Sequence, residues 1–203
     1  RPDAILCAWQ AGQEGGNSVA DVLSGKVNPS GKLTMTFPVR FQDAASSANF
    51  PLDGAMSSMD FANMKEGDGS RRNWDYTDYE EDIFVGYRYF DSFGKEVSYP
   101  FGYGLSYTTF EYGQPSVDFA DGVYKVNVEV RNSGNVAGRE VVELYAASPD
   151  SKAADRPEKE LKAFAKTPLL AAGETCKVTL TLNAADLASF DTTSSSWVVA
   201  GGN

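Results

Sequence analysis

The sequence predicts an α/β segment followed by an all-β sandwich, and two patterns carry this prediction. Within residues 4–38, a short apolar run is followed by a glycine-rich loop, a helix-forming stretch, a tight turn and an alternating stretch. In the second half, short stretches of alternating apolar and polar residues recur with turn signals between them, which is typical of a sandwich. We place the boundary near Gln114-Pro115, so the predicted domains are residues 1–114 and 115–203.

The first domain opens with a predicted strand, a helix and a second strand. Residues 4–8 (AILCA) form the kind of apolar run that a strand buried on both faces shows. Asn17 is a good N-cap for a helix with apolar residues at helical spacing, and Gly25 suits its left-handed C-terminal cap. The NPSG sequence at residues 28–31 indicates a tight turn, and apolar residues then alternate over residues 33–37 until a proline ends the strand.

Residues 39–82 form a long connection with little periodicity. Connections longer than about 15 residues in compact domains are usually functional or disordered. The connection ends in an acidic run, Glu80, Glu81 and Asp82, which precedes an aromatic stretch that we expect to be a strand. We favour a solvated edge over a catalytic acid and base for this run.

The second domain contains a series of predicted strands. Alternation and turn signals place them at residues 124–130, 141–145, 161–166, 176–182 and 197–200. Residues 186–190 fit one turn of helix in a crossover.

Composition excludes several classes of function. Hydrophobic residues make up 42% of the chain and aromatic residues 12%, which indicates a globular protein rather than a disordered one. The formal net charge is −10 and no basic cluster is longer than Arg71-Arg72, so we expect no nucleic acid and no anionic membrane as partner. Histidine is absent, which removes Ser-His-Asp and Cys-His catalysis. We therefore expect neither a metal nor a cofactor.

The two cysteines, Cys7 and Cys176, lie one in each predicted domain. Two interpretations stay open: an inter-domain disulfide, or two buried small hydrophobic side chains.

Three ordered segments resemble glycoside hydrolase family 3, the β-glucosidase and β-xylosidase family. Residues 9–38 match its W-x-x-G-x-E-G-G loop, its A-D-x-L-x-G helix and its N-P-S-G-K-L-x-x-T-F-P strand. Residues 79–91 are similar to its Y-x-E-G-I-F-V-G-Y-R-Y-F-D segment, with Asp82 where a glycine is usual. Residues 99–110 are similar to the Y-P-F-G-Y-G-L-S-Y-T-T-F run that closes the family's second domain.

The resemblance implies a fold and an activity. The first domain would be the C-terminal portion of an (α/β)6 sandwich, and the second would be fibronectin-III-like. The activity would be retaining, double-displacement hydrolysis of terminal O-glycosidic bonds in oligosaccharides or aryl and alkyl glycosides, in the periplasm or outside the cell. The family's nucleophilic aspartate lies on an N-terminal (β/α)8 barrel, and its acid/base glutamate lies upstream of the W-x-x-G-x-E-G-G loop. We therefore expect neither catalytic carboxylate after Arg1 and no activity from this chain alone.

Five residues are candidates for contact with substrate. In the family, the long connection borders the pocket, so Arg71, Arg72, Trp74 and Tyr76 could form a rim that stacks on sugar rings. The alternative is a solvated loop whose aromatic side chains pack locally. Glu14 lies in the glycine-rich loop, either as a polar residue at the pocket edge or as a carboxylate that binds loop amides and the following helix.

A second class of function is a freestanding carbohydrate-binding or adhesion module. Such a module would show evenly spaced aromatic residues on one exposed sheet face. The aromatic residues of the predicted sandwich are instead scattered over separate strands and turns: Tyr124, Tyr145, Phe164, Phe190 and Trp197. This scatter favours the glycosidase.

Overall fold

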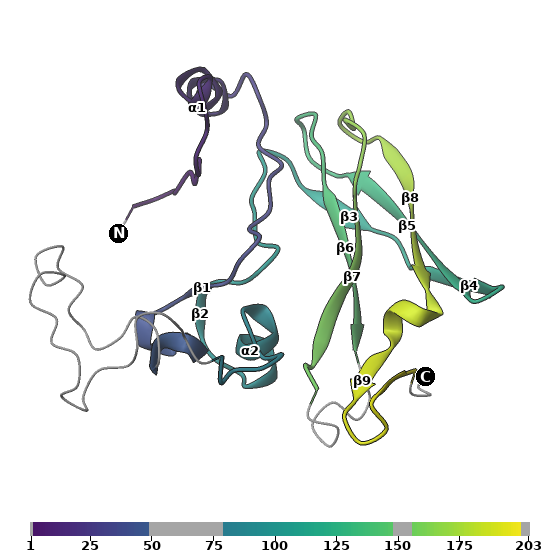
Figure 1. The fold of residues 1–203 in the computed structure, drawn as a ribbon. Helices are drawn as coiled ribbons and strands as arrows, with labels where there is room; N and C mark the ends of the chain where they lie inside the picture. The colour runs from purple at the N-terminus through teal and green to yellow at the C-terminus, as the bar shows by residue number, and fades with distance from the viewer. Residues whose placement is uncertain (1, 49–78, 148–155, 200–203) are drawn as a thin grey trace, which may run out of the picture. The chain divides into compact units, whose positions relative to one another are not determined.

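The computed structural model describes residues 2–48, 79–147 and 156–199 (Figure 1). The chain divides into two compact units. Unit 1 contains Arg1–Lys32, Gly104–Leu144 and Lys162–Ala200, and unit 2 contains Leu33–Tyr103, Tyr145–Leu161 and Gly201–Asn203. Each unit therefore draws on both halves of the sequence.

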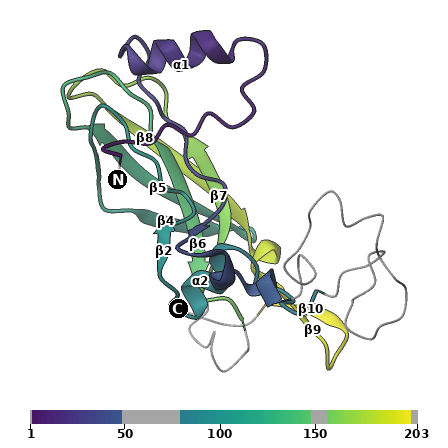
Figure 2. The same ribbon diagram turned by 90° about the vertical axis from the view of Figure 1, so that its left-hand side faces the viewer.

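Unit 1 contains a sheet organised around one long strand. Its strands are β3 (Phe110–Tyr112), β4 (Ser116–Ala120), β5 (Val123–Asn132) and β8 (Thr175–Asn183). Along one edge, β5 pairs antiparallel with β8; along its other edge, it pairs first with β4 and then with β3 (Figures 1 and 2). Asp121 and Gly122, both with positive φ, form the turn between β4 and β5.

The core lies between this sheet and a second pair of strands. The strands β6 (Val141–Ala147) and β7 (Lys159–Lys166) pair with each other. Alternation on β5 and β8 places every second side chain on the inner face. Five buried residues form the core, and Leu144, Ala163 and Ala165 pack against it: Val128, Val130, Val142, Val178 and Leu180. The predicted all-β sandwich is confirmed.

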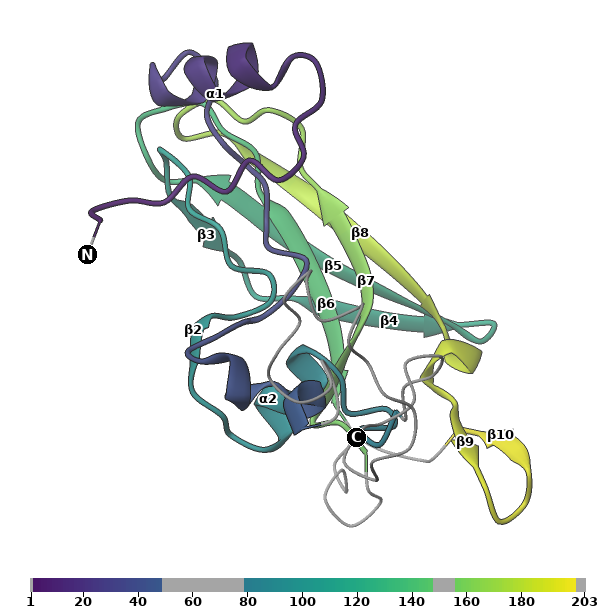
Figure 3. The same ribbon diagram turned by 60° about the vertical axis from the view of Figure 1, so that its left-hand side comes forward.

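The sandwich continues beyond β8 into a short hairpin. A 3₁₀ turn, Ala184–Leu187, leads to β9 (Ser189–Asp191), which pairs antiparallel with β10 (Ser196–Val198) (Figure 3). The Phe190 ring meets the Trp197 ring edge to face, with 5.6 Å between centroids. The turn of helix expected at residues 186–190 thus begins two residues earlier and ends before β9.

The helix α1 (Gly15–Leu23) belongs to unit 1 and begins earlier than expected. Glu14 occupies the N-cap position in place of Asn17, because the Ser18 amide already donates to the Glu14 carbonyl oxygen at 2.9 Å. Gly25 has a φ of 76°, and its amide donates to the Val22 carbonyl oxygen, which confirms it as the left-handed residue after the helix.

The strand expected at residues 4–8 is wrong. The segment has no regular secondary structure, and Ile5 is 66% exposed and Leu6 43% exposed. A buried strand needs a hydrogen-bonded neighbour, and no strand within the described ranges pairs with this segment.

Unit 2 holds short elements joined by local hydrogen bonds. The strand expected over residues 33–38 shortens to β1 (Phe37–Pro38), which pairs with β2 (Val97–Tyr99), because the chain bends at residues 34–35. Part of the long connection forms two 3₁₀ turns, Phe41–Asp43 and Ala45–Ala48.

The aromatic strand expected after the acidic run is also wrong. The stretch instead contains the helix α2 (Tyr87–Ser92). Gly86, with φ of 55°, turns the chain into the helix, and Tyr87 and Phe90 are three positions apart, as residues on one helical face are. Phe90 is only 5% exposed. Neither this helix nor any other helix in the described part of the chain is long and apolar enough to cross a membrane.

Candidate functional site

The structure leaves most of the predicted substrate contacts untested. Arg71, Arg72, Trp74 and Tyr76 lie outside the described residues. Glu14 is described, and its carboxylate accepts a hydrogen bond from the Asn17 side-chain amide at 2.7 Å on the exposed surface. This contact of Glu14 is local, at the start of α1.

The acidic run forms an exposed turn rather than the edge of a strand. The Phe84 amide donates to the Glu81 carbonyl oxygen at 2.9 Å, and Asp82 has a φ of 49°. A left-handed backbone favours glycine, which explains why a glycine is usual at the Asp82 position of the resembled motif. Aspartate is among the few other residues that tolerate this conformation.

The expected inter-domain disulfide is wrong, and the expectation of two buried side chains is wrong for Cys7, whereas Cys176 is partly buried and packs against the sandwich core. Cys7 and Cys176 are free thiols, so the structure contains no disulfide between them. Cys7 is exposed, and Cys176 is only half-buried. Burial, followed by the nearby Glu174 carboxylate, raises the pKa of the Cys176 thiol. Within the described ranges, no three His, Cys, Asp or Glu side chains gather in a way that could hold a metal ion.

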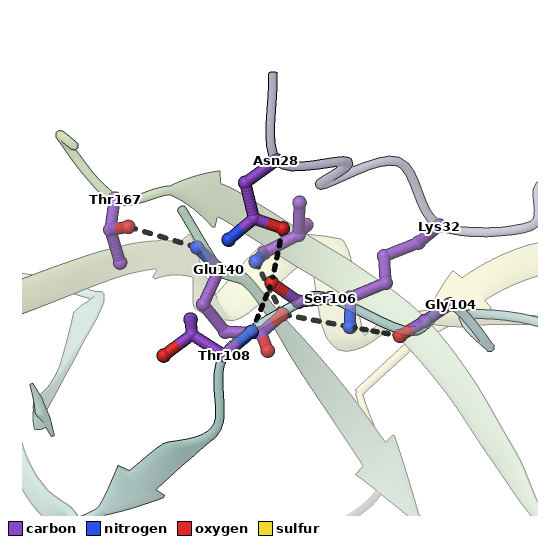
Figure 4. Close-up of polar contacts among 8 residues, drawn as sticks. Asn28, Lys32, Gly104, Ser106, Thr108, Glu140 and Thr167 are labelled. Carbon is purple, nitrogen blue, oxygen red and sulfur yellow. Dashed lines mark hydrogen bonds and ion pairs between the residues drawn. The ribbon is translucent and has the colours of Figure 1, made fainter. Parts of the chain in front are cut away.

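The best-organised polar group in unit 1 is a set of side chains that we call the junction cluster, defined as Asn28, Lys32, Ser106, Thr108, Glu140 and Thr167 (Figure 4). Its members come from three parts of the sequence: the NPSGK segment after α1, the segment before β3, and the ends of the sandwich strands β6 and β7. The tight turn expected at residues 28–31 is wrong, because the chain turns earlier, at residues 24–27, and residues 28–33 have no regular structure. We keep the name NPSGK turn for residues 28–32 as the name of the motif. The sheet pairing of β3 with β5 brings the second part to the sandwich.

Asn28 connects two of these parts. Its Oδ1 accepts hydrogen bonds from the Ser106 hydroxyl at 2.9 Å and from the Tyr107 amide at 2.8 Å. Its Nδ2 donates to the Ala137 carbonyl oxygen at 3.0 Å. An amide side chain is needed here because it donates and accepts at once.

Lys32 and Glu140 form a partly buried ion pair. Their Nζ and Oε1 atoms are 2.9 Å apart, and their side chains are 21% and 12% exposed. Lys32 also donates to the Gly104 carbonyl oxygen at 3.0 Å, and Glu140 Oε1 accepts from the Val141 amide at 2.7 Å. These additional hydrogen bonds are what a buried ion pair requires to offset the loss of hydration.

Two further contacts tie the cluster to the sandwich. The Glu140 amide donates to Thr167 Oγ1 at 3.0 Å, and Thr108 Oγ1 donates to Asn132 Oδ1 at 2.6 Å. Asn132 is the last residue of β5 and is fully buried. Its Nδ2 donates to the carbonyl oxygens of Val136 and Leu170.

The backbones approach so closely at the cluster that a side chain would not fit. A Cβ atom at Gly104 would collide with the Gly31 carbonyl oxygen. A Cβ atom at Gly138 would lie 2.7 Å from Thr108 Cγ2 and 2.8 Å from Asn28 Nδ2. Both glycines are therefore explained by packing.

The chemistry of the cluster is that of a structural contact. Its one carboxylate, Glu140, is bound to Lys32, so the cluster offers no second carboxylate for acid and base catalysis. The charge of Glu140 does act on its surroundings. Partial burial, followed by the carboxylates of Glu140 and Glu143, raises the pKa of Tyr112 to about 12.

The sequence interpretation recognised the NPSGK turn and the segment before β3 as motifs, but it did not predict that they meet. The available signal was polar side chains at fixed positions beside glycines in both motifs. Their partners in the sandwich, Glu140 and Thr167, carry no local pattern that marks them.

Comparison with known proteins gives two family matches. The family described as "Glycosyl hydrolase family 3 C-terminal domain" matches residues 1–107. The family described as "Fibronectin type III-like domain" matches residues 140–203. The junction cluster contains residues from both matched ranges.

Relatives and solved structures agree with these matches. Beta-glucosidase A from Butyrivibrio fibrisolvens is 42% identical, over 93% of this chain and 22% of that protein. Beta-glucosidase 3B from Thermotoga neapolitana, solved in complex with glucose, is 48% identical with a TM-score of 0.78, over 93% of this chain and 24% of that one. Beta-glucosidase from Kluyveromyces marxianus, also with glucose, has a TM-score of 0.81 and 38% identity, over 96% and 21%. This chain thus spans less than a quarter of the length of these three proteins.

Proposed function

The chain belongs to glycoside hydrolase family 3, and on this premise we propose that it is the C-terminal part of a glycosidase that hydrolyses terminal O-glycosidic bonds of β-glucosides. The observation that carries the proposal is the match, at 48% identity and a TM-score of 0.78, to a beta-glucosidase solved with glucose. Because the chain covers less than a quarter of each of the three proteins compared above, we assign hydrolysis to a longer protein that contains this chain.

We propose that both catalytic carboxylates lie outside this chain. Retaining hydrolysis requires two carboxyl groups about 5 Å apart, one as nucleophile and one as acid and then base. Two of the described carboxylates support the proposal by their local contacts: Glu140 pairs with Lys32, and Glu14 binds Asn17. The chain would then contribute support and pocket rim, with the (β/α)8 barrel as its partner.

The first experiment compares the 203-residue chain with the longer protein on aryl β-glucoside, β-xyloside and β-N-acetylglucosaminide. We expect turnover from the longer protein only. Turnover by the chain that survives purification and is lost in Glu14→Gln or Glu81→Gln would contradict the proposal. Glycan binding with no turnover by either protein would favour a carbohydrate-binding module instead.

Arg71, Arg72, Trp74 and Tyr76 remain the proposed rim residues. In the longer protein, Trp74→Ala should raise KM roughly fivefold with little change in kcat, since removing one stacking contact weakens substrate and transition state alike. The matched control is Trp197→Ala, which removes an exposed tryptophan of the β9–β10 hairpin. Equal kinetics in the two variants would leave the long connection without a role in binding.

The family resemblance also underlies a proposed location in the periplasm or outside the cell. Fractionation of cells that produce the longer protein, followed by the glucoside assay, tests it. Activity confined to the cytoplasm would contradict it.

A further inference from the structure

We propose that the NPSGK turn is a docking element for the fibronectin-III-like sandwich, so that the turn and the strands β5 and β8 unfold together. The turn connects α1 to the rest of the family-3 domain, whereas β5 and β8 form the sheet of the sandwich. The proposal concerns folding and does not depend on the proposed function. Three sets of contacts carry it.

The first set is made by Asn28, whose side-chain oxygen and nitrogen both form hydrogen bonds. Its Oδ1 accepts from the Tyr107 amide, three positions before β3, and its Nδ2 donates to the Ala137 carbonyl oxygen in the turn after β5. Asn28 and Ala137 are 109 positions apart in sequence. A solvated turn would need no partner at such a distance, because its polar groups could bind water.

The second set is the ion pair of Lys32 and Glu140. Removing one member of an ion pair with so little exposure destabilises the fold, because the remaining charge then has neither its partner nor its full hydration. Glu140 precedes β6 directly, and its amide is held by Thr167, the residue after β7. Lys32 therefore attaches the turn to the starting and ending points of the β6–β7 pair.

The third set of contacts connects the segment before β3 to β5 and β8 of the sheet. Thr108 donates to Asn132, which ends β5 and has no exposed surface. Asn132 then binds the Leu170 carbonyl oxygen, and its own amide donates to the Glu174 carbonyl oxygen, just before β8. Displacing the segment before β3 would leave Asn132 without one of its partners inside the sandwich, and an unsatisfied buried polar group is costly.

The test is amide hydrogen exchange of the whole chain in Asn28→Ala, with Asn17→Ala as the matched control. Both variants remove one asparagine side chain, but the Asn17 side chain donates to Glu14 on the exposed surface and within the same helix start. We expect Asn28→Ala to lower the protection of β5 and β8 by about tenfold or more, because this variant loses the three hydrogen bonds of one side chain at once. The control should change this protection less than about twofold.

The hydrogen bonds of Asn28 end on Ser106, Tyr107 and Ala137, which lie outside β5 and β8. A change of protection in these two strands therefore measures how strongly the turn and the sheet are coupled. Unchanged protection in β5 and β8, with free exchange only in residues 26–33 and 104–108, would overturn the proposal. Complete loss of protection in Asn28→Ala, with Asn17→Ala still folded, would support it.

Glu140→Gln provides a second variant with a milder change. Glutamine keeps the size of the side chain and an acceptor for the Val141 amide, but it removes the charge that faces Lys32. We expect a lower thermal midpoint, by about 10 °C, with β5, β8 and the NPSGK turn losing protection together. An unchanged midpoint, or a turn that opens while the sandwich keeps its protection, would overturn the proposal.

Discussion

Tyr112 shows how a single residue responds to the charges around it. It lies on β3 opposite Val130 and is half-exposed. Partial burial acts first on its hydroxyl, and the carboxylates of Glu140 and Glu143 add to the effect, so its pKa rises to about 12. The neutral phenol is thus favoured in the folded chain relative to the unfolded one, whose tyrosine has the ordinary value near 10.

A pH titration checks this residue. Because the folded pKa is raised, the contribution of Tyr112 to stability is fully present below about pH 10 and is lost as the pH rises towards about 12. Tyrosinate absorbance of the folded chain should show a late phase near pH 12 that disappears in Tyr112→Phe. Tyr79→Phe, at a tyrosine that is 81% exposed, is the matched control. A late phase that persists in Tyr112→Phe would show that the assignment is wrong.

At the scale of elements, we expect alanine substitution of two glycines to change the free energy of unfolding in opposite directions. Gly138 faces Thr108 and Asn28 so closely that Gly138→Ala must displace the NPSGK turn, at a cost of about 1–3 kcal/mol in the free energy of unfolding. Gly16 lies in α1 with open space around it, so Gly16→Ala should stabilise the chain by about 0.5–1 kcal/mol.

Urea unfolding of both glycine variants measures the two changes. Each substitution adds one methyl group, and neither glycine has a positive φ, so backbone strain contributes to neither change. Equal effects at the two positions would contradict the close approach at the junction cluster.

Elements with a regular pattern and a local cause were the predictable ones. The strands β5 and β8 follow from strict alternation, and the end of α1 follows from Gly25. The strand predicted at residues 4–8 was wrong because an apolar run indicates only that a surface can be buried, and it does not indicate that a partner strand is present. The stretch at α2 was misjudged because aromatic residues favour strands, while their spacing of three suits a helix.

The junction cluster could not be predicted for a different reason. The hydrogen bonds of Asn28 and Lys32 join residues that are 72–109 positions apart, and no periodicity extends over that distance. Charge alone did not identify the pair either, because Lys32 and Glu140 are two of 18 basic and 28 acidic residues. Only the resemblance to family motifs marked Asn28 and Ser106 as positions of interest.

At the scale of the whole molecule, the apolar segment at the start of the chain predicts self-association. Ile5 is 66% exposed and Trp9 is 57% exposed, and contiguous apolar surface tends to become covered. We expect the 21.9 kDa chain to sediment as larger species as its concentration rises. Ile5→Asp combined with Leu6→Asp should restore the monomer.

The control for this prediction carries the same added charge. Gln10→Asp combined with Gln13→Asp places two carboxylates on exposed polar positions near the same segment. If this control abolishes association as well, charge repulsion is the cause and the apolar segment is not. A monomeric unmodified chain at all concentrations would contradict the prediction directly.

The sequence distance between Asn28 and Ala137 also determines how long Asn28 waits for this partner during synthesis. Ribosomes add about 5–20 residues per second, so the 109 positions from Asn28 to Ala137 take roughly 5–20 s to translate. During these seconds Asn28 has been synthesised, but the Ala137 carbonyl oxygen that accepts from its side-chain amide has not. Nascent chains therefore carry an Asn28 side chain without its acceptor until residue 137 has been added.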